Sequence, residues 1–349
     1  MKHKILHIHS NKVWRGAEQQ IDYIINYPSS MFEHYLFCVQ DGALHQKNKN
    51  KTVFGYKKHF GFDILAAWNL KKYCAEKKID LLHLHDSHAI NTYQIAHFFG
   101  LKIKAVIHRH VLFPIKHPKK YTKNIAKIIC SSNAIKQTLE TFIDADNLVV
   151  IHPSVDVQLF QKNKQKQNLI KTSLALENTA KLIGIVAALE EEKNVIEFIE
   201  IAQQCIKKKS NYHFIIIGTG SLYEKYKATY QNQQIHFLGF RNDIPVLLSE
   251  LDIFLFTSKT EGFGQVIIEA MAANVCVISK NFPAVYDTIQ HEKTGFIYTD
   301  KNEVCTLLET ILQSSKIQAQ ITQQAAVLVQ QFDVPLMMEK IEKCYLSVL

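Results

Sequence analysis

The sequence predicts an α/β protein built from two Rossmann-like domains, each with a doubly wound parallel sheet. Short apolar runs of β type alternate with longer segments of helical period, and this alternation favours parallel sheets with helices on both faces. The pattern occurs twice along the chain. The length of 349 residues also suits two domains better than one.

The expected elements follow this alternation in order. Strands are predicted at residues 5–9, 34–39, 81–84, 105–108, 127–130, 148–151, 182–187, 213–217, 236–238, 253–256 and 275–278. Helices are predicted at residues 18–26, 64–77, 133–142, 195–208, 264–272 and 304–312.

The domain boundary is expected where the periodicity breaks. Residues 152–156, with the sequence HPSVD, interrupt it, and the polar run at residues 161–168 is typical of a linker. We therefore assign residues 1–160 to the first domain and residues 161–333 to the second. Residues 334–349 read as a separate amphipathic helix, which we expect to return to the first domain.

The composition is that of an ordinary globular protein. Hydrophobic residues make up 47% of the chain and charged residues 21%, which argues against disorder. No apolar run is long enough to span a bilayer, and the first residues lack the apolar core of a signal peptide. We expect a cytoplasmic protein whose seven scattered cysteines are buried reduced thiols.

The formal net charge of +9 favours an anionic partner. A basic stretch gathers lysines at Lys116, Lys119, Lys120, Lys123 and Lys127. Two interpretations stay open: a solvated basic face, or a dock for anionic lipid at the inner face of the plasma membrane. The chain carries no zinc-finger or RNA-binding signature, so we expect no nucleic-acid partner.

The most informative stretch is residues 259–272, with the sequence KTEGFGQVIIEAMA, directly after a predicted buried strand. Gly262 and Gly264 permit backbone conformations and a close ligand approach that a side chain would forbid. A helix that begins near Gly264 points free N–H groups and the positive end of its dipole toward the carboxyl edge of the sheet. Open α/β sheets bind ligands at this edge, so the stretch predicts a phosphate site.

Glu269 lies in an otherwise apolar part of this helix. An unpaired buried carboxylate is costly, so Glu269 needs donors, and sugar or ribose hydroxyls would serve. Glu261 lies on the loop before the helix. From the residues alone a structural interpretation also stays open: Glu261 would complement the helix dipole, and Glu269 would pair with a core lysine or arginine.

Glu261 and Glu269, separated by seven residues, together with Gly262, Phe263 and Gly264, resemble the paired-glutamate motif of the family 4 retaining glycosyltransferases, also called glycosyl transferases group 1. This resemblance implies the GT-B fold, in which two Rossmann-like domains face an interdomain cleft. It further implies that the first domain binds the acceptor and the second binds a nucleotide sugar.

The resemblance also implies roles for the residues of the motif. Glu269 would bond the donor ribose, and Glu261 would contact the transferred sugar. The loop and the helix start would bind the sugar and the donor diphosphate through Gly262, Phe263, Gly264, Gln265 and Val266.

Other segments extend the resemblance over most of the chain. Phe240 and Arg241 lie in a segment similar to the one that meets the nucleotide base, and residues 151–160 resemble the interdomain segment. Lys193 matches a diphosphate-binding lysine. Ala188, however, stands where an arginine is common in the family, which puts the strength of diphosphate binding in doubt.

Three further positions in the strand-to-helix turns are candidates. Arg15 and Gly16 resemble the family's first glycine-rich loop, in which Gly16 would admit phosphate or acceptor and Arg15 would add charge. His110 resembles the histidine near the transferred sugar. Tyr223 replaces the third glycine of a dinucleotide fingerprint that would begin at Gly218, so the fingerprint is incomplete. We therefore interpret Gly218 as part of a strand-to-helix turn that contacts the nucleotide.

His83, His85 and His88 lie at and beyond a predicted strand end, and with Asp86 they suggest a metal cluster. Their spacing equally suits a transition from strand to loop, and the chemistry of the resembled family needs no metal ion. We therefore predict no metal site and no cofactor besides the donor.

The resemblance implies transfer with retention of configuration, from a UDP- or GDP-linked sugar to an envelope glycan or lipid-linked acceptor. Glu261, His110 and Lys193 would carry the catalytic roles. Two alternatives remain: a non-catalytic relative that binds a nucleotide or glycan, and a non-hydrolysing sugar-nucleotide 2-epimerase. An NAD-dependent dehydrogenase is disfavoured because its glycine fingerprint is incomplete.

Overall fold

The computed structural model describes residues 2–49, 52–58, 63–115, 117–162 and 167–349. The chain divides into one unit formed by Met1–Pro153 with Val334–Leu349 and a second formed by Ser154–Asp333. Residues 154–160 thus belong to the second unit, whereas the sequence placed them in the first. Val155 explains the difference, because its amide donates to the Phe332 carbonyl at 2.9 Å and ties this segment to the end of the second unit.

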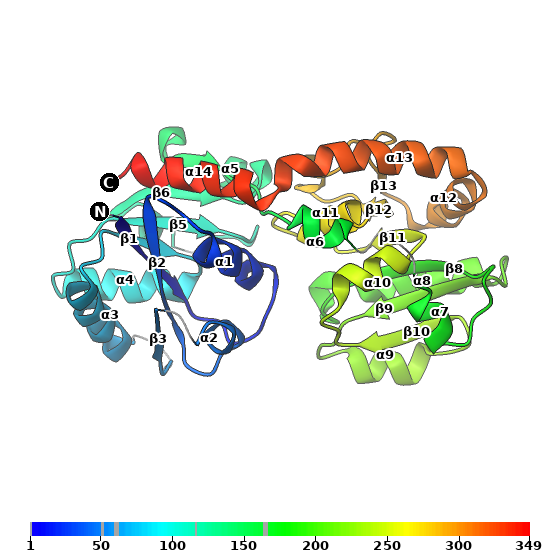
Figure 1. Cartoon of the computed structure of the whole chain (residues 1–349), viewed down its shortest axis with the longest axis horizontal. Coiled ribbons are helices and arrows are strands. Elements are labelled where there is room, and N and C mark those ends of the chain that lie inside the picture. The colour runs from blue at the N-terminus through cyan, green and yellow to red at the C-terminus, as the bar shows by residue number, and fades with distance from the viewer. Residues whose placement is uncertain (1, 50–51, 59–62, 116, 163–166) are drawn as a thin grey trace. The chain divides into compact units, whose positions relative to one another are not determined.

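Within the described residues, the first unit is built on a parallel sheet of seven strands in the order β3-β2-β1-β4-β5-β6-β7 (Figure 1). The strands are β1 His3–His9, β2 Phe32–Val39, β3 Val53–Tyr56, β4 Leu81–Leu84, β5 Ala105–Arg109, β6 Ile125–Cys130 and β7 Leu148–Val150. The α-helices are α1 Gly16–Asn26, α2 Ala43–Lys47, α3 Ile64–Lys77, α4 Ser87–Phe98, α5 Asn133–Leu139 and α14 Val334–Leu346.

Helices cover both faces of this sheet. Alternate strand residues point to opposite faces. Leu6, Leu82 and Ile107 pack on one face in a core that includes residues of α3, α4 and α5. Ile5 and Leu81 pack on the other face in a core that includes residues of α1 and α14. The C-terminal helix thereby completes the core of the first unit, although it follows the whole of the second unit in the chain.

The second unit has a parallel sheet of six strands in its described residues, in the order β10-β9-β8-β11-β12-β13 (Figure 1). The strands are β8 Lys181–Val186, β9 Tyr212–Ile217, β10 Ile235–Gly239, β11 Ile253–Phe256, β12 Cys276–Lys280 and β13 Phe296–Tyr298. The α-helices are α6 Val157–Gln161, α7 Leu169–Ser173, α8 Val195–Ile206, α9 Tyr223–Tyr230, α10 Ile244–Glu250, α11 Gln265–Ala272, α12 Lys301–Gln313 and α13 Ser315–Leu328.

A disulfide in the second unit corrects the expectation that every cysteine is a reduced thiol. Helices α8 and α12 pack together in the core on one face of the sheet. Their packing brings the Cα atoms of Cys205 and Cys305 to 5.5 Å, and the two sulfurs are bonded. This separation lies in the ordinary range for disulfides. Free buried thiols are present at Cys38, Cys74, Cys130, Cys276 and Cys344.

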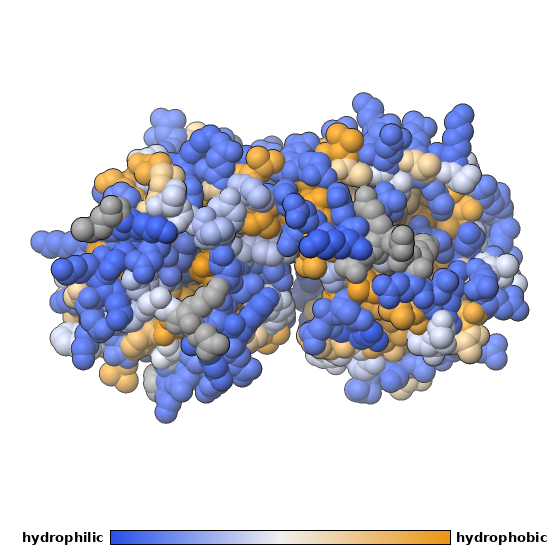
Figure 2. All heavy atoms as spheres, in the orientation of Figure 1, coloured by the Kyte–Doolittle hydropathy of each residue, from blue (hydrophilic) through white to orange (hydrophobic). Residues whose placement is uncertain are grey.

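The visible surface of each unit is mostly hydrophilic, with smaller apolar patches between the polar side chains (Figure 2). Among the described residues, no helix combines the length and the apolar content that a bilayer-spanning segment requires.

Candidate active site

The strand order of the second sheet places its ligand site between β8 and β11. The chain winds outward from β8 in one direction through β9 and β10, and from β11 in the other through β12 and β13. Ligands of open α/β sheets bind outside the carboxyl ends of the strands at this reversal. Lys193 ends the 3₁₀ turn Glu191–Lys193 after β8, and Glu261 lies in the loop after β11. Two of the predicted catalytic residues are therefore neighbours at the reversal point.

Lys193 and Glu261 form an ion pair at this edge. Nζ of Lys193 lies 2.7 Å from Oε1 of Glu261, and both side chains are partly shielded from solvent. The amine is therefore held over the loop that leads into α11. A charged lysine kept at that point can transfer its hydrogen bonds to an incoming phosphate.

The start of α11 depends on two residues of the predicted motif. Gly264 caps the helix with φ of 84°, in the left-handed region that favours glycine. A Cβ at this position would also lie 3.0 Å from Ile267 Cδ1 and 3.1 Å from Phe282 Cζ. Phe263 is buried, with its ring 5.5 Å from that of Phe332, and this packing anchors the loop. Gln265 and Val266 form the first turn of α11, where the free N–H groups of a helix attract anions.

Glu269 lies one turn further along α11. It is half-buried and accepts a hydrogen bond from Gln265 Nε2 at 3.0 Å. Burial raises the pKa of the Glu269 carboxyl to about 7, although the bond from Gln265 lowers it in part. Ionisation of the Glu269 carboxyl is therefore unfavourable in this structure. A ligand that donates hydrogen bonds from hydroxyl groups would favour the ionised form.

The structure adds a second lysine that the sequence analysis missed. Lys280 ends β12, and its Nζ lies 2.7 Å from Oε1 of Glu197 in α8. Tyr298 donates to the same carboxylate at 2.9 Å, and Asn194 binds the other oxygen at 2.7 Å. The signal in the sequence was a lysine at the end of an apolar strand. This network holds a second cation at the carboxyl edge of the sheet.

Three weaker candidates also belong to the second unit. Phe240 is exposed, and Arg241 is held by Asp243 through Nη2–Oδ2 at 2.5 Å. Gly218 has φ of 132°, and a Cβ there would lie 2.0 Å from the Ala187 carbonyl oxygen. The close approach of the backbone after β8 therefore accounts for glycine at position 218.

In the first unit, Arg15 and Gly16 begin α1 and are exposed. The Arg15 amide donates to Glu18 Oε2 at 2.9 Å, and the other oxygen of Glu18 lies 2.6 Å from Nε2 of His9. Burial opposes a charge on His9, but its contacts with Asp86 and Glu18 outweigh that effect and raise its pKa to about 9. The loop from β1 to α1 is therefore tied to a protonated histidine.

His110 follows β5 and is half-buried. Its ring stacks on that of His108 at 4.0 Å between centroids, and burial lowers the pKa of His110 to about 4. His110 is therefore a neutral imidazole at pH 7. As a neutral group it donates one hydrogen bond through its protonated ring nitrogen and accepts one at the other.

The suggested cluster of His83, His85, His88 and Asp86 does not form as a unit. Asp86 caps α4 and accepts from the amides of His88 and Ala89 at 2.9 Å. His88 faces a different carboxylate, with Nε2 3.9 Å from Asp63 Oδ2. His83 and His85 are buried instead among histidines of the neighbouring strands.

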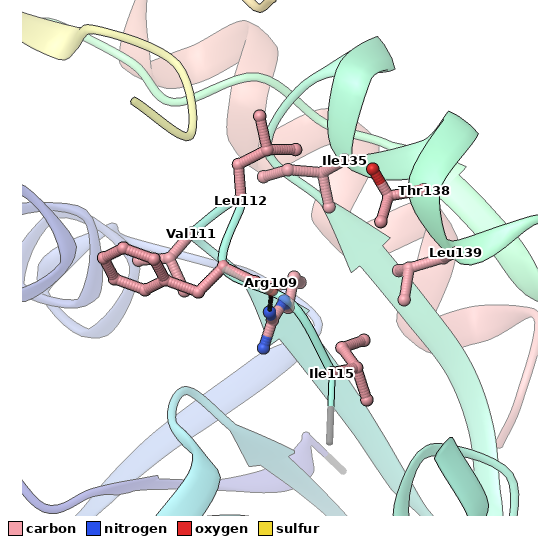
Figure 3. Close-up of a pocket in the computed structure, with 8 residues that line it drawn as sticks. Arg109, Val111, Leu112, Ile115, Ile135, Thr138 and Leu139 are labelled. Atoms are coloured by element: carbon pink, nitrogen blue, oxygen red, sulfur yellow. Dashed lines mark hydrogen bonds between the residues drawn. The ribbon is translucent and has the colours of Figure 1, made fainter. Parts of the chain in front are cut away.

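A shallow, mostly apolar pocket lies between the loop after β5 and helix α5 (Figure 3). Its wall includes Leu112 from the loop and Ile135 from the helix. Arg109 also borders it, and its guanidinium donates to Tyr121 Oη at 2.6 Å and to the Phe113 carbonyl. Arg109 therefore fixes the loop, while Val111 and Phe113 remain exposed.

Some lysines of the basic stretch are exposed to solvent, and others are hydrogen-bonded within the first unit. Lys119 and Lys123 are exposed, whereas Lys120 donates to Asn91 Oδ1 at 2.8 Å and Lys127 donates to the Asp146 carbonyl. Lys116 lies outside the described residues.

Two family models match the chain in succession. The model described as Glycosyltransferase Family 4 matches residues 14–159, and the model described as Glycosyl transferases group 1 matches residues 166–327. The chain belongs to the family 4 glycosyltransferases. In this glycosyltransferase each model covers most of one unit, and the second contains the Lys193–Glu261 pair.

Curated relatives and solved structures agree with this assignment. The glycosyltransferase is 25% identical over 272 residues to the UDP-Gal:α-D-GlcNAc-diphosphoundecaprenol α-1,3-galactosyltransferase of Escherichia coli, covering 72% of this chain and 70% of that protein. It is 22% identical over 268 residues to the N-acetyl-α-D-glucosaminyl L-malate synthase of Bacillus anthracis, covering 70% and 67%. HepE of Anabaena, solved with UDP-glucose, matches with a TM-score of 0.87 and 21% identity over 99% of each chain. The fold is therefore GT-B, as predicted.

Proposed function

We propose that this glycosyltransferase moves a sugar from a UDP-linked donor to a lipid-linked or glycan acceptor of the cell envelope, with retention of anomeric configuration. The Lys193–Glu261 pair at the start of α11 is the observation that carries the proposal, because it places a cation and a carboxylate at one ligand edge. Support for the donor and acceptor classes comes from the names of relatives: the E. coli enzyme uses UDP-Gal and a diphosphoundecaprenol acceptor, and HepE was solved with UDP-glucose.

The second unit would bind the donor. Its diphosphate would lie at the N-terminus of α11, where the amides of Gln265 and Val266 and the Lys193 amine supply hydrogen bonds. The ribose hydroxyls would donate to Glu269, because burial now disfavours its ionised form and these hydrogen bonds would stabilise it. Phe240 and the backbone beside it would meet the base, and the first unit would present the acceptor near His110.

The chemistry follows from where charge develops. The bond from the anomeric carbon to the diphosphate oxygen breaks, and a bond to the acceptor oxygen forms on the same face. The acceptor proton passes to the departing phosphate. Lys193 and the α11 N-terminus stabilise the negative charge on the leaving diphosphate, and Glu261 positions the sugar. Because these groups supply the positive charge, the diphosphate would need no divalent cation.

An assay of nucleotide release tests the proposal. The full chain would be incubated with UDP- and GDP-linked sugars and with undecaprenyl-diphosphate sugars or short glycans as acceptors. We expect free nucleoside diphosphate in step with a glycosylated acceptor, and NMR of that product should show the donor's anomeric configuration. Donor binding without turnover would favour a non-catalytic relative. Conversion of the donor sugar in the absence of an acceptor would favour an epimerase, and an inverted product would contradict retention.

A peripheral association with the membrane is a further part of the proposal. Exposed Lys119 and Lys123 lie near the exposed Val111 and Phe113 along the chain. Basic residues close to apolar side chains bind anionic lipid surfaces. Such a surface would bring the enzyme to a lipid-linked acceptor at the cytoplasmic face of the membrane.

A further inference from the structure

Arg109, the last residue of β5, is a buried cation at the carboxyl edge of the first sheet. It is 8% exposed, and in the part of the chain that the structure describes its guanidinium has two hydrogen-bond partners and no carboxylate partner. The two partners are the Tyr121 hydroxyl at 2.6 Å and the Phe113 carbonyl, which are both uncharged. We propose that Arg109 and the apolar pocket beside it bind a lipid phosphate, meaning a phosphate group attached to a hydrocarbon chain.

The present partners leave the Arg109 guanidinium incompletely satisfied. A buried charge without an opposite charge costs free energy, and neutral acceptors offset this cost less than an anion does. A guanidinium carries five N–H donors, and the hydrogen bonds to Tyr121 and Phe113 use one on Nη1 and one on Nη2. Phosphate oxygens accept paired hydrogen bonds from a guanidinium and supply the missing negative charge. Arg109 therefore favours an anion such as a phosphate.

The pocket beside Arg109 has apolar walls. Leu112 and Ile115 border it from the loop after β5, and Ile135 and Leu139 border it from helix α5. These side chains lie around a space on one side of Arg109 (Figure 3). A single cation beside aliphatic walls suits the junction between a phosphate and a hydrocarbon chain. Because the pocket is shallow, it would hold only the first few carbons of such a chain.

Arg109 also places this pocket next to the proposed position of the acceptor. His110 is the next residue along the chain, and neighbouring residues of an extended backbone point to opposite sides. The His110 ring stacks on His108, whereas the Arg109 guanidinium faces Tyr121. A phosphate bound to Arg109 would therefore hold an attached sugar close to His110. This step rests on the proposed function, in which the acceptor is linked to a lipid.

The apolar surface favours a lipid phosphate over a free phosphate ion. Val111 is 41% exposed and Phe113 is 55% exposed, and both border the pocket. A hydrocarbon chain that leaves the pocket would cover these side chains, and burial of apolar surface contributes about 25 cal/mol per Å². A free phosphate ion would gain nothing from these contacts. The occupant should therefore bind through its charged group and through its chain together.

The first test compares three probes by calorimetry with the full chain. Farnesyl diphosphate carries both a phosphate group and a hydrocarbon chain, whereas inorganic diphosphate and farnesol each carry one of the two. We expect farnesyl diphosphate, kept below the concentration at which it aggregates, to bind at least about 10-fold more tightly than either of the others. Equal affinity for inorganic diphosphate would indicate a free-phosphate site, and equal affinity for farnesol would indicate a pocket without an anion site. Either result would overturn the proposal.

Variants of Arg109 separate charge recognition from support of the loop. Arg109→Gln should weaken farnesyl diphosphate binding about 10-fold and change farnesol binding less than about 2-fold, while Arg109→Lys, which keeps the charge, should lie between the wild type and the glutamine variant. Lys104→Gln is the matched control, because Lys104 precedes the other end of β5 and also donates to a backbone carbonyl, that of Val348 at 2.7 Å.

Two outcomes would contradict the assignment to Arg109. An equal loss of farnesol and farnesyl diphosphate binding in Arg109→Gln would show that the arginine only holds the loop. Loss of farnesyl diphosphate binding in Lys193→Ala, with wild-type binding in Arg109→Gln, would place the diphosphate at the donor site of the second unit.

An exposed position keeps the test valid if Arg109→Gln folds poorly. Thr138 is exposed on α5 and borders the pocket, so Thr138→Phe should fill it and weaken farnesyl diphosphate binding without weakening that of inorganic diphosphate. Gln137→Phe, at an exposed position of the same helix outside the pocket wall, is the control. Wild-type affinity for farnesyl diphosphate in Thr138→Phe would contradict the proposal. Because this probe carries no sugar, failure of the binding test would leave the proposed transfer reaction intact, and absence of transfer would not alter the binding result.

Discussion

Lys193 Nζ lies 2.7 Å from Glu261 Oε1, and this pair joins the turn after β8 to the loop after β11 at the reversal point of the second sheet. The sequence predicted both residues as catalytic but gave no sign that they contact each other. The contact has a consequence for donor binding. To bind the donor diphosphate, Lys193 must either leave Glu261 or contact both groups at once. The two side chains should therefore act as a unit, and the effects of their substitutions on donor binding should not be additive.

The shielded carboxyl of the half-buried Glu269 should make the free energy of unfolding depend on pH. Its folded pKa of about 7 lies above its ordinary value of 4.5, so its contribution to stability is full below pH 4.5 and is lost as pH rises through about 7. Glu269→Gln should therefore raise the Tm relative to the wild type at pH 8 and have little effect at pH 4. It should also weaken donor binding about 10-fold or more, since a charged acceptor is lost. Glu200→Gln, at an exposed ion pair with Lys301, is the control. A Tm difference that is the same at both pH values would contradict the raised pKa.

Ala188 tests whether the donor site lacks a positive charge. Ala188 is the second residue after β8, at a position where the family resemblance leads us to expect arginine, and the nearby charge of Lys280 is paired with Glu197 at 2.7 Å. Ala188→Arg should tighten binding of UDP several-fold, because guanidinium groups bind phosphate through paired hydrogen bonds. Ala188→Gln, of similar length and without charge, should not. Equal affinities for the wild type and the arginine variant, measured by calorimetry, would show that the site already holds sufficient charge.

Donor binding should not require a divalent cation. Lys193 and the N-terminus of α11 supply positive charge at the proposed diphosphate site. The affinity for UDP should therefore be the same, within about 2-fold, in EDTA and in Mg²⁺ or Mn²⁺. A rise of 10-fold or more on addition of Mg²⁺ would contradict this description.

The exposed lysines should give salt-sensitive binding to anionic vesicles. Lys119→Glu with Lys123→Glu should reduce co-sedimentation with phosphatidylglycerol vesicles at low salt, where the attraction between lysines and anionic lipid is strongest. At physiological ionic strength, charges more than about 8 Å apart are largely screened, so the difference should shrink. Lys316→Glu with Lys340→Glu changes the net charge equally at other positions of the chain and serves as the control. Binding that ignored lipid charge and salt would count against a basic dock.

The sequence was most informative where function and local structure coincide. The stretch from Lys259 to Ala272 predicted a glycine-capped helix after a buried strand, and the structure has β11, Gly264 and α11 in that order. Alternation of apolar runs likewise predicted both parallel sheets. These features depend on short-range patterns, namely strand length, glycine at a left-handed position and the helical period.

Other features depended on contacts that no local pattern reveals. Asp86 was considered as a metal ligand and disfavoured, and the structure shows that it caps α4. The sequence did not predict this helix, which is rich in polar and histidine residues. The disulfide joins cysteines 100 residues apart, and their spacing carried no signal. The packing of His85 beside His108 and His110 also arises from sheet order, which places the ends of β4 and β5 side by side.

The measurement that tests the central claim most directly is the turnover of Lys193→Ala with the donor and acceptor found in the nucleotide-release assay. Charge on the diphosphate grows in the transition state, so kcat should fall about 10- to 100-fold and at least as much as KM rises. Lys301→Ala removes a lysine from an ion pair of the same 2.7 Å length with Glu200 and should leave both constants near the wild-type values. Wild-type kcat and KM in a folded Lys193→Ala protein would contradict the role proposed for the Lys193–Glu261 pair.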